Sequence, residues 1–368
     1  MSTTLKPIDL PFFLIVLLLT GTGFLIFSSA ASGLLARDGA TFASVAATQA
    51  LLGVGGGLIA LSIFSKVDYR IFSKYAVPLF VLALLATVLT FVPGIGLELK
   101  GAHRWIVIMG VSVQPSEFLK CATIILLSSY FAKNYKHVGT IKRGFLPFLC
   151  ILGIASLPVA LQPDHDSIMI LAFGSTAVFF GAGGKVKHLL IILVFAAAGA
   201  AVALSIHPYL MGRVTTFLHP DRDPTGAGFQ VQQSLIAVGS GEMFGRGFGQ
   251  SIQKFSYLPE PIGDSVFAVA GEEFGFAGTV FLVLLFLAFI AAGLRIAASS
   301  SDRFGGLLVI GLVILIGSQS FLNMVSLIGL FPLSGLPLMF VSHGGTALFL
   351  ALAESGIILS VSRRRKHT

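Results

Sequence analysis

Charged residues are scarce in this sequence of 368 residues. Asp, Glu, Lys and Arg together make up 11% of the chain, whereas a water-soluble domain usually carries roughly a quarter of its residues as these four types. The composition therefore excludes an ordinary soluble globular protein of this length. It favours a chain that lies in a membrane.

Cysteine is nearly absent, and the motifs of metal and nucleotide binding are missing. Cys121 and Cys150 lie in or beside apolar runs, and neither belongs to a Cys-x-x-Cys or Cys/His metal spacing. A disulfide is possible but not needed, and we interpret both as small core residues. Gly245, Gly247 and Gly249 are not followed by Lys-Ser or Lys-Thr, which excludes a P-loop.

Long apolar runs are what the sequence does contain. Hydrophobic residues make up 55% of the chain, and the mean hydropathy is +0.93. A hydrocarbon core about 30 Å thick requires about 20 residues of helix. We therefore predict an all-α polytopic membrane protein, a single domain over residues 1–368, with about ten transmembrane helices near residues 10–30, 43–65, 76–93, 114–131, 144–162, 165–183, 188–206, 265–294, 304–330 and 338–361. The first is interpreted as a retained helix rather than a cleaved signal peptide.

Lys and Arg fall mainly on one side of these runs. Sixteen of the 24 basic residues lie in one alternating set of connections, which includes Lys66, Lys136 and the C-terminal run 363–366. The positive-inside rule then predicts that both termini are cytoplasmic. The formal charge of +8 is explained by topology and anionic headgroups, without nucleic acid.

One outer connection, residues 207–264 between the seventh and eighth predicted helices, is much the longest. Long connections in compact proteins are usually functional or disordered. Here glycines alternate with polar residues, which favours an ordered, functional segment. Its candidate binding residues are Arg213, Gln230, Gln233, Ser234, Lys254 and Glu260.

Asp264 closes this connection, immediately before an apolar run. A carboxylate at the mouth of a transmembrane helix is partly desolvated, which raises its pKa and suits it to accept a proton. A helix N-cap explains the same residue equally well. Asp223, in Asp-Pro-x-Gly, is similarly compatible with a simple turn.

Three further groups, outside or within the membrane, are candidate functional-site residues. Glu117 and Lys120 are three residues apart in the fourth run, so they can pair, either functionally or as a structural ion pair. Arg104 could hold a phosphate, while the neighbouring Trp105 suits the membrane interface. Asp164 and its neighbours in Gln-Pro-Asp-His-Asp could bind a divalent cation or simply form a polar hairpin.

The order of motifs resembles the SEDS family (shape, elongation, division and sporulation). The matching segments are Gly101-Ala-His-Arg-Trp-Ile, Gln114-Pro-Ser-Glu-Phe-Leu-Lys, Gln162-Pro-Asp, Asp223-Pro-x-Gly-x-Gly-Phe-Gln, Gln233-Ser, Gly239-Ser-Gly, Gln253-Lys-x-x-Tyr-Leu-Pro-Glu, Asp264-x-x-Phe-Ala, Asn323, Pro332-Leu-Ser-Gly-Leu-Pro and Ser342-His-Gly-Gly-Thr. The segment beginning at Gln253 is more similar to the FtsW and SpoVE branch than to RodA. Two positions depart from the pattern: Gly263 replaces the usual Thr, and His343 replaces the usual Tyr.

The resemblance implies a peptidoglycan glycosyltransferase that polymerises lipid II at the outer face of the bacterial cytoplasmic membrane. It implies a catalytic Asp264 and, as substrate contacts, Arg104, Glu117, Lys120, Asp164, Arg213, Gln230, Gln233, Ser234, Lys254, Glu260 and Ser342. It further implies a divalent cation, Mg²⁺ or Mn²⁺, and a class B penicillin-binding protein as partner, besides other proteins of division or elongation complexes.

The expected reaction is attack by the GlcNAc 4-hydroxyl of an acceptor lipid II on C1 of the MurNAc of the growing strand. Asp264 would be the general base, and undecaprenyl diphosphate would leave with inversion. Arg104, Lys120, Lys254 and the cation would offset charge on the diphosphate. The alternatives are a flippase for a lipid-linked precursor, which intramembrane charges would also suit, and a scaffold, which would leave Asp264 without a purpose.

Overall fold

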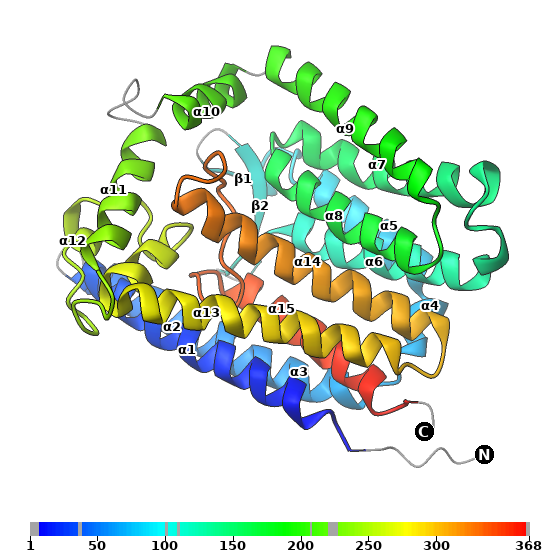
Figure 1. Ribbon diagram of the computed structural model, residues 1–368, viewed down its shortest axis with the longest axis horizontal. Helices are drawn as coiled ribbons and strands as arrows, with labels where there is room; N and C mark the ends of the chain where they lie inside the picture. Colours follow the sequence, from blue (N-terminus) through cyan, green and yellow to red (C-terminus); the bar gives the residue numbers. More distant parts are fainter. Residues whose placement is uncertain are drawn as a thin grey trace.

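The computed structural model of the protein describes residues 7–35, 39–99, 102–108, 111–206, 208–219 and 227–365. These residues form a helical bundle with one small sheet (Figure 1). The elements are α1 (Leu10–Leu35), α2 (Gly39–Ala47), the π-helix η1 (Thr48–Gly56), α3 (Gly57–Lys66), α4 (Arg70–Lys74), α5 (Ala76–Leu89), β1 (Gly96–Leu99), β2 (Ala102–Ile108), β3 (Val111–Val113), α6 (Pro115–Lys133), η2 (Tyr135–His137), η3 (Ile141–Phe145), α7 (Leu146–Leu161), α8 (His165–Gly181), α9 (Val186–Ile206), α10 (Pro208–Leu218), α11 (Ala227–Ser240), α12 (Gln253–Ser256), α13 (Val266–Ala298), α14 (Arg303–Leu327) and α15 (Gly345–Ser362).

The predicted polytopic helical fold is confirmed. In the described part of the chain, seven helical segments are long and apolar enough to cross a membrane, and α5 and α8 are shorter apolar helices. The remaining predicted span, the fourth in the chain, is α6, which carries Glu117 and Lys120 among its apolar residues. Each predicted run therefore coincides with a helix, and the second consists of α2, η1 and α3 without a break.

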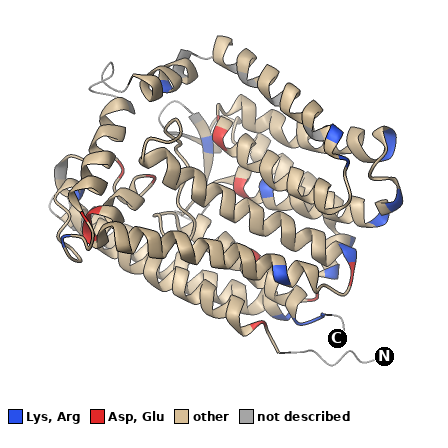
Figure 2. Cartoon of the chain, viewed as in Figure 1, with Lys and Arg blue, Asp and Glu red and all other residues tan. Residues whose placement is uncertain are grey.

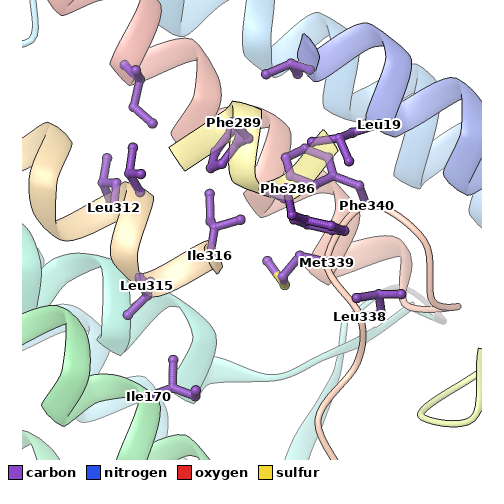
Figure 3. Packing of buried hydrophobic residues seen from close by; sticks show 14 of the residues in the cluster. Leu19, Ile170, Phe286, Phe289, Leu312, Leu315, Ile316, Leu338, Met339 and Phe340 are labelled. Atoms are coloured by element: carbon purple, nitrogen blue, oxygen red, sulfur yellow. The ribbon is translucent and has the colours of Figure 1, made fainter. Parts of the chain in front are cut away.

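The tenth run begins later than the sequence predicts. We expected a helix from residue 338, but α15 begins at Gly345, and the preceding residues form a turn segment. The backbone at Phe340 has a φ of 67°, which a helix cannot contain. The Phe340 side chain packs against Phe286 and Phe289, with ring centroids 6.4 Å and 5.8 Å away (Figure 3). The apolar residues just before α15 therefore pack in the core without forming a helix.

A three-stranded antiparallel sheet of order β1-β2-β3 connects α5 to α6. Ile106 in the central strand pairs with Gly96 on one side and Val113 on the other. The hydrophobic runs did not predict this sheet, because its strands are short and interrupted by polar residues. The central strand carries Arg104, so the sheet fixes the direction from which that side chain reaches the bundle.

The core lies around α14 and α15, which contact α13, α8, α6 and α3. Small residues allow this close packing in lipid. A Cβ added at Gly311 of α14 would lie 2.4 Å from Ile124 of α6 and 2.6 Å from Val178 of α8. Leu312, Leu315 and Ile316 of the same helix complete the apolar centre (Figure 3).

The long connection before Asp264 is folded wherever it is described. It contains α10, α11 and α12, and α11 packs against α13 and α14. Asp223 and the rest of 220–226 lie outside the described residues. At the opposite end of the bundle lie both termini, as an even number of crossings requires (Figure 1). Many Lys and Arg residues gather at that end (Figure 2).

Candidate active site

Asp264 lies in the turn that leads into α13, with its side chain partly buried. The N-cap of α13 is Ser265, which makes no side-chain capping hydrogen bond. Asp264 is therefore one residue outside the cap, and the N-cap explanation of this carboxylate is wrong. An acidic group in this position still benefits from the positive end of the helix.

One amide orients the Asp264 carboxylate. Gln230 of α11 donates from Nε2 to Asp264 Oδ1 at 3.1 Å and to Ser265 Oγ at 2.9 Å. Gln233 and Ser234 lie three and four positions further along α11, and Ser234 donates its hydroxyl to Gln230 O within the helix. Gln230 thus holds the carboxylate, while the Ser234 hydroxyl supports its own helix.

The main chain around Asp264 is fixed from two other elements. Asn323 of α14 donates from Nδ2 to Asp264 O at 2.7 Å and to Leu336 O at 2.8 Å. Ser342 donates from Oγ to Gly263 O at 2.6 Å and accepts from Leu338 N at 2.8 Å. The buried Ser342 hydroxyl therefore supports the turn, and its contact with substrate stays a prediction.

The two departures from the family pattern flank this turn. A Cβ added at Gly263 would meet Glu260 atoms no closer than 3.7 Å, so the close approach of the chain does not require a glycine there. His343 donates its main-chain N–H to Ile262 O at 2.6 Å and stacks its ring on Phe27 at a centroid distance of 5.9 Å. Burial lowers the pKa of the His343 imidazole, and the Glu260 carboxylate acts against that shift. His343 therefore packs as a largely uncharged ring near neutral pH.

Lys254 does not face the open side of this site. Its ammonium, with the side chain fully buried, donates to Glu273 Oε1 at 2.8 Å, Ser29 Oγ at 2.9 Å and Gly249 O at 2.9 Å. Glu272 accepts from Ser251 Oγ at 2.6 Å and from two main-chain N–H groups of the same loop. These contacts join the loop to α1 and α13, and the diphosphate contact of Lys254 stays a prediction.

A second cluster of polar side chains lies at the same end of the bundle as Asp264. It contains Arg104, Asp164 and Arg213. Asp164 caps α8, accepting from Ser167 N at 3.3 Å and Ser167 Oγ at 2.8 Å. Arg104 donates to Gln162 O at 3.0 Å and Pro163 O at 2.6 Å, with Nη1 4.0 Å from Asp164 Oδ1. The sheet and the α7–α8 turn are therefore joined by an arginine whose remaining surface is still partly exposed.

Asp166, which the sequence offered only as a possible cation ligand beside Asp164, holds Arg213. Arg213 donates from Nη1 to Asp166 Oδ2 at 2.8 Å, and Gly335 N donates to the same oxygen at 3.2 Å. Beside Arg213 lies a small cleft between α10, α11 and the end of α14, lined mainly by the apolar side chains of Phe217, Val231, Leu235, Phe331 and Leu333. A cation at the edge of an apolar cleft suits an amphiphile with a lipid tail and an anionic head.

The intramembrane pair forms as its spacing predicts. Lys120 Nζ donates to Glu117 Oε1 at 2.8 Å and to Gln319 Oε1 at 2.7 Å, and the lysine is 1% exposed. Gln319 in turn donates toward Pro337 O at 3.4 Å. The pair is thus buried inside the bundle, linked to the segment before α15 rather than open to a substrate. Sequence reasoning missed Gln319, although a lone amide in an apolar run is itself a signal.

The described residues offer no ready metal site. No group of three or more His, Cys, Asp or Glu side chains in them could hold an ion. Asp164 and Asp166 already accept hydrogen bonds from Ser167, Gln114, Arg213 and Gly335. The Gln-Pro-Asp-His-Asp segment therefore folds as the polar hairpin, and its carboxylates do not form a prepared cation site.

Comparison with known proteins agrees with this architecture. The sequence pattern of the FtsW, RodA and SpoVE cell cycle proteins matches residues 10–367. The chain is 36% identical over 361 residues to a probable peptidoglycan glycosyltransferase FtsW of Geobacter sp. (strain M18), covering 97% of both chains. It is 37% identical over 321 residues to the stage V sporulation protein E of Bacillus subtilis (strain 168), covering 87% of this chain and 88% of that one.

Two solved structures share the fold. One is a chain of a peptidoglycan synthase complex that coordinates polymerization and crosslinking, with a TM-score of 0.79 and 26% identity over 97% of this chain and 98% of that chain. The other is the crystal structure of the rod shape determining protein RodA of Thermus thermophilus, with a TM-score of 0.69 and 25% identity over 98% of both. Because the match extends over almost the whole chain, this protein belongs to the FtsW/RodA/SpoVE family.

Proposed function

We propose that the protein is a peptidoglycan glycosyltransferase that polymerises lipid II, with Asp264 as its general base. One observation carries the assignment of Asp264: its carboxylate is partly buried at the mouth of α13, oriented by Gln230 and fixed through its main chain by Asn323. A base held within hydrogen-bond reach of a hydroxyl contributes typically 10²–10⁴-fold to a rate.

The reaction needs one proton acceptor and a place for a lipid diphosphate. The 4-hydroxyl of the acceptor GlcNAc forms a bond to C1 of the donor MurNAc while the bond from C1 to the diphosphate oxygen breaks. The hydroxyl proton passes to Asp264, and undecaprenyl diphosphate leaves with both bonding electrons. Arg213, at the edge of the apolar cleft, and the exposed part of Arg104 are the cations placed to oppose charge on that diphosphate.

The described residues contain no group of three or more His, Cys, Asp or Glu side chains that could hold the cation implied by the resemblance. Because Asp164 and Asp166 are occupied by hydrogen bonds, a divalent ion would depend on the diphosphate for most of its oxygen ligands. No step of the proposed mechanism passes through it.

A class B penicillin-binding protein is the proposed partner, because the structural match is to a chain of a synthase complex that couples polymerization to crosslinking. The test is incubation of the purified protein with fluorescent lipid II, alone and with its cognate transpeptidase. Glycan strands longer than the substrate are expected, most abundantly with the partner. Translocation of lipid II across reconstituted vesicles without polymer formation would instead establish a flippase.

The proposed location is the bacterial cytoplasmic membrane, with both termini in the cytoplasm and Asp264 outside. In a background in which both native cysteines are replaced by alanine, Met243→Cys should react with an impermeant maleimide in intact cells, because this side chain is exposed in the long connection that ends at Asp264. Lys136→Cys, at the opposite end, should react only after permeabilisation. The reverse labelling pattern would invert the topology and remove Asp264 from the side where glycan is made.

A further inference from the structure

Gln49 is a buried amide in a span that otherwise faces lipid and neighbouring apolar helices. It lies in the π-helix η1 and is 1% exposed. Burying an amide is costly unless its polar atoms are hydrogen-bonded. Its partners therefore indicate why the amide is tolerated there.

Both ends of the Gln49 amide bind the main chain of one short segment. Nε2 donates to Ser342 O at 3.2 Å, and Oε1 accepts from Gly344 N at 3.2 Å. One side chain thus fixes the backbone on both sides of His343. No apolar residue, and no side chain with only a donor or only an acceptor, can make both contacts.

This segment is the one that holds the turn containing Asp264. Ser342 Oγ donates to Gly263 O, and His343 N donates to Ile262 O, each at 2.6 Å. Only the segment 342–344, which is hydrogen-bonded to both, therefore separates Gln49 from the turn that contains Asp264. We infer that Gln49 is a positioning residue for the glycosyl transfer: it sets the place of the Asp264 carboxylate through the segment 342–344.

The local sequence explains how an amide from the second span reaches that segment. A Cβ at Gly57 would lie 2.4 Å from Leu352, and one at Gly53 would lie 3.1 Å from Leu348, so these glycines allow η1 and α3 to approach α15 closely. The wider π-helical turn begins at the residue before Gln49, and single π-turns are frequent at functional sites. The close approach brings Gln49 to the start of α15.

The inference rests on the proposed polymerase activity and predicts a specific kinetic change. A displacement of about 1 Å of a catalytic group can cost about 100-fold in rate. Gln49→Met retains the side-chain length and removes both hydrogen bonds, so kcat for lipid II polymerisation should fall about 10- to 100-fold. KM should change little, because a side chain that is 1% exposed cannot contact the substrate.

Gln49→Glu provides a reversible test within one folded protein. A protonated carboxyl can donate to Ser342 O and accept from Gly344 N as the amide does, whereas an ionised carboxylate can only accept. The activity of this variant relative to the wild type should therefore rise as pH falls, and fall again when pH is restored. The wild type, measured at the same pH values, is the reference for every other group that the two proteins share.

Thr48→Val is the matched control, because it removes a hydroxyl of η1 that donates to Ser44 O within the same span. It should leave kcat within about twofold, since the lost hydrogen bond is made to Ser44 and not to the segment 342–344, and valine keeps the methyl group that lies beside Gly345. Full kcat in Gln49→Met would overturn the inference, as would a Gln49→Glu ratio that does not change with pH. Absence of polymer from the wild type would instead count against the proposed function itself.

Discussion

Replacement of Asp264 by Asn is expected to reduce lipid II polymerisation by about 10²–10⁴-fold, the usual contribution of a general base. The substitution preserves the size of the side chain and its acceptor for the Gln230 amide, which donates to Oδ1. Because Ser265 and not Asp264 is the N-cap of α13, little stability should be lost. Initial rates with fluorescent lipid II, together with thermal unfolding in detergent, measure both effects.

The control for this substitution is Glu242→Gln, an exposed acid-to-amide change in the same long connection, residues 207–264. It should retain activity within about twofold, which separates loss of the base from loss of negative charge in general. Lipid II binding by Asp264→Asn should remain near that of the wild type. Polymerisation by Asp264→Asn at the wild-type rate would disprove the role of Asp264, and Glu260 in the same turn would be tested next.

The helical fold could be predicted because hydrophobic length is a direct physical requirement of the bilayer. The same criterion failed at residues 338–344, where the apolar side chains of Leu338 and Phe340 fill the core from a segment with no helical backbone. It also missed β1–β3, since strands of three to seven residues leave no comparable signal. Hydropathy reports burial or lipid contact, and it does not distinguish a helix from an apolar turn inside the bundle.

The site was predictable where a residue type already implies its partner. The spacing of Glu117 and Lys120 implied their ion pair, and the position of Asp264 before an apolar run implied a partly desolvated carboxylate. The partners of Lys254 could not be inferred, because Ser29 lies 225 residues away and Glu273 lies in the following span. For the same reason Gln49 and Gln319 were missed: their roles depend on main-chain atoms of segments near residue 340.

Removal of Lys120 alone is expected to destabilise the protein by about 3–5 kcal/mol, the usual cost of leaving a buried charge without its partner. Lys120→Met would leave Glu117 without its cation and Gln319 Oε1 without its donor. It would also leave a second carboxyl group, Glu354 of α15, buried within electrostatic range of Glu117. The free energy of unfolding, measured by denaturant titration in mixed micelles, should report this loss together with reduced polymerisation.

The double variant Glu117→Gln/Lys120→Met separates a structural ion pair from a catalytic one. Removing both charges leaves no uncompensated ion in the pair, so at least half of the stability lost in Lys120→Met should return. Polymerisation should return with it if Lys120 is needed only to neutralise the buried Glu117 carboxylate. A well-folded double variant that remains inactive would instead show that turnover needs Lys120 itself, through its charge or through its hydrogen bond to Gln319. An unfolding free energy of Lys120→Met within about 1 kcal/mol of the wild type would contradict the buried pair altogether.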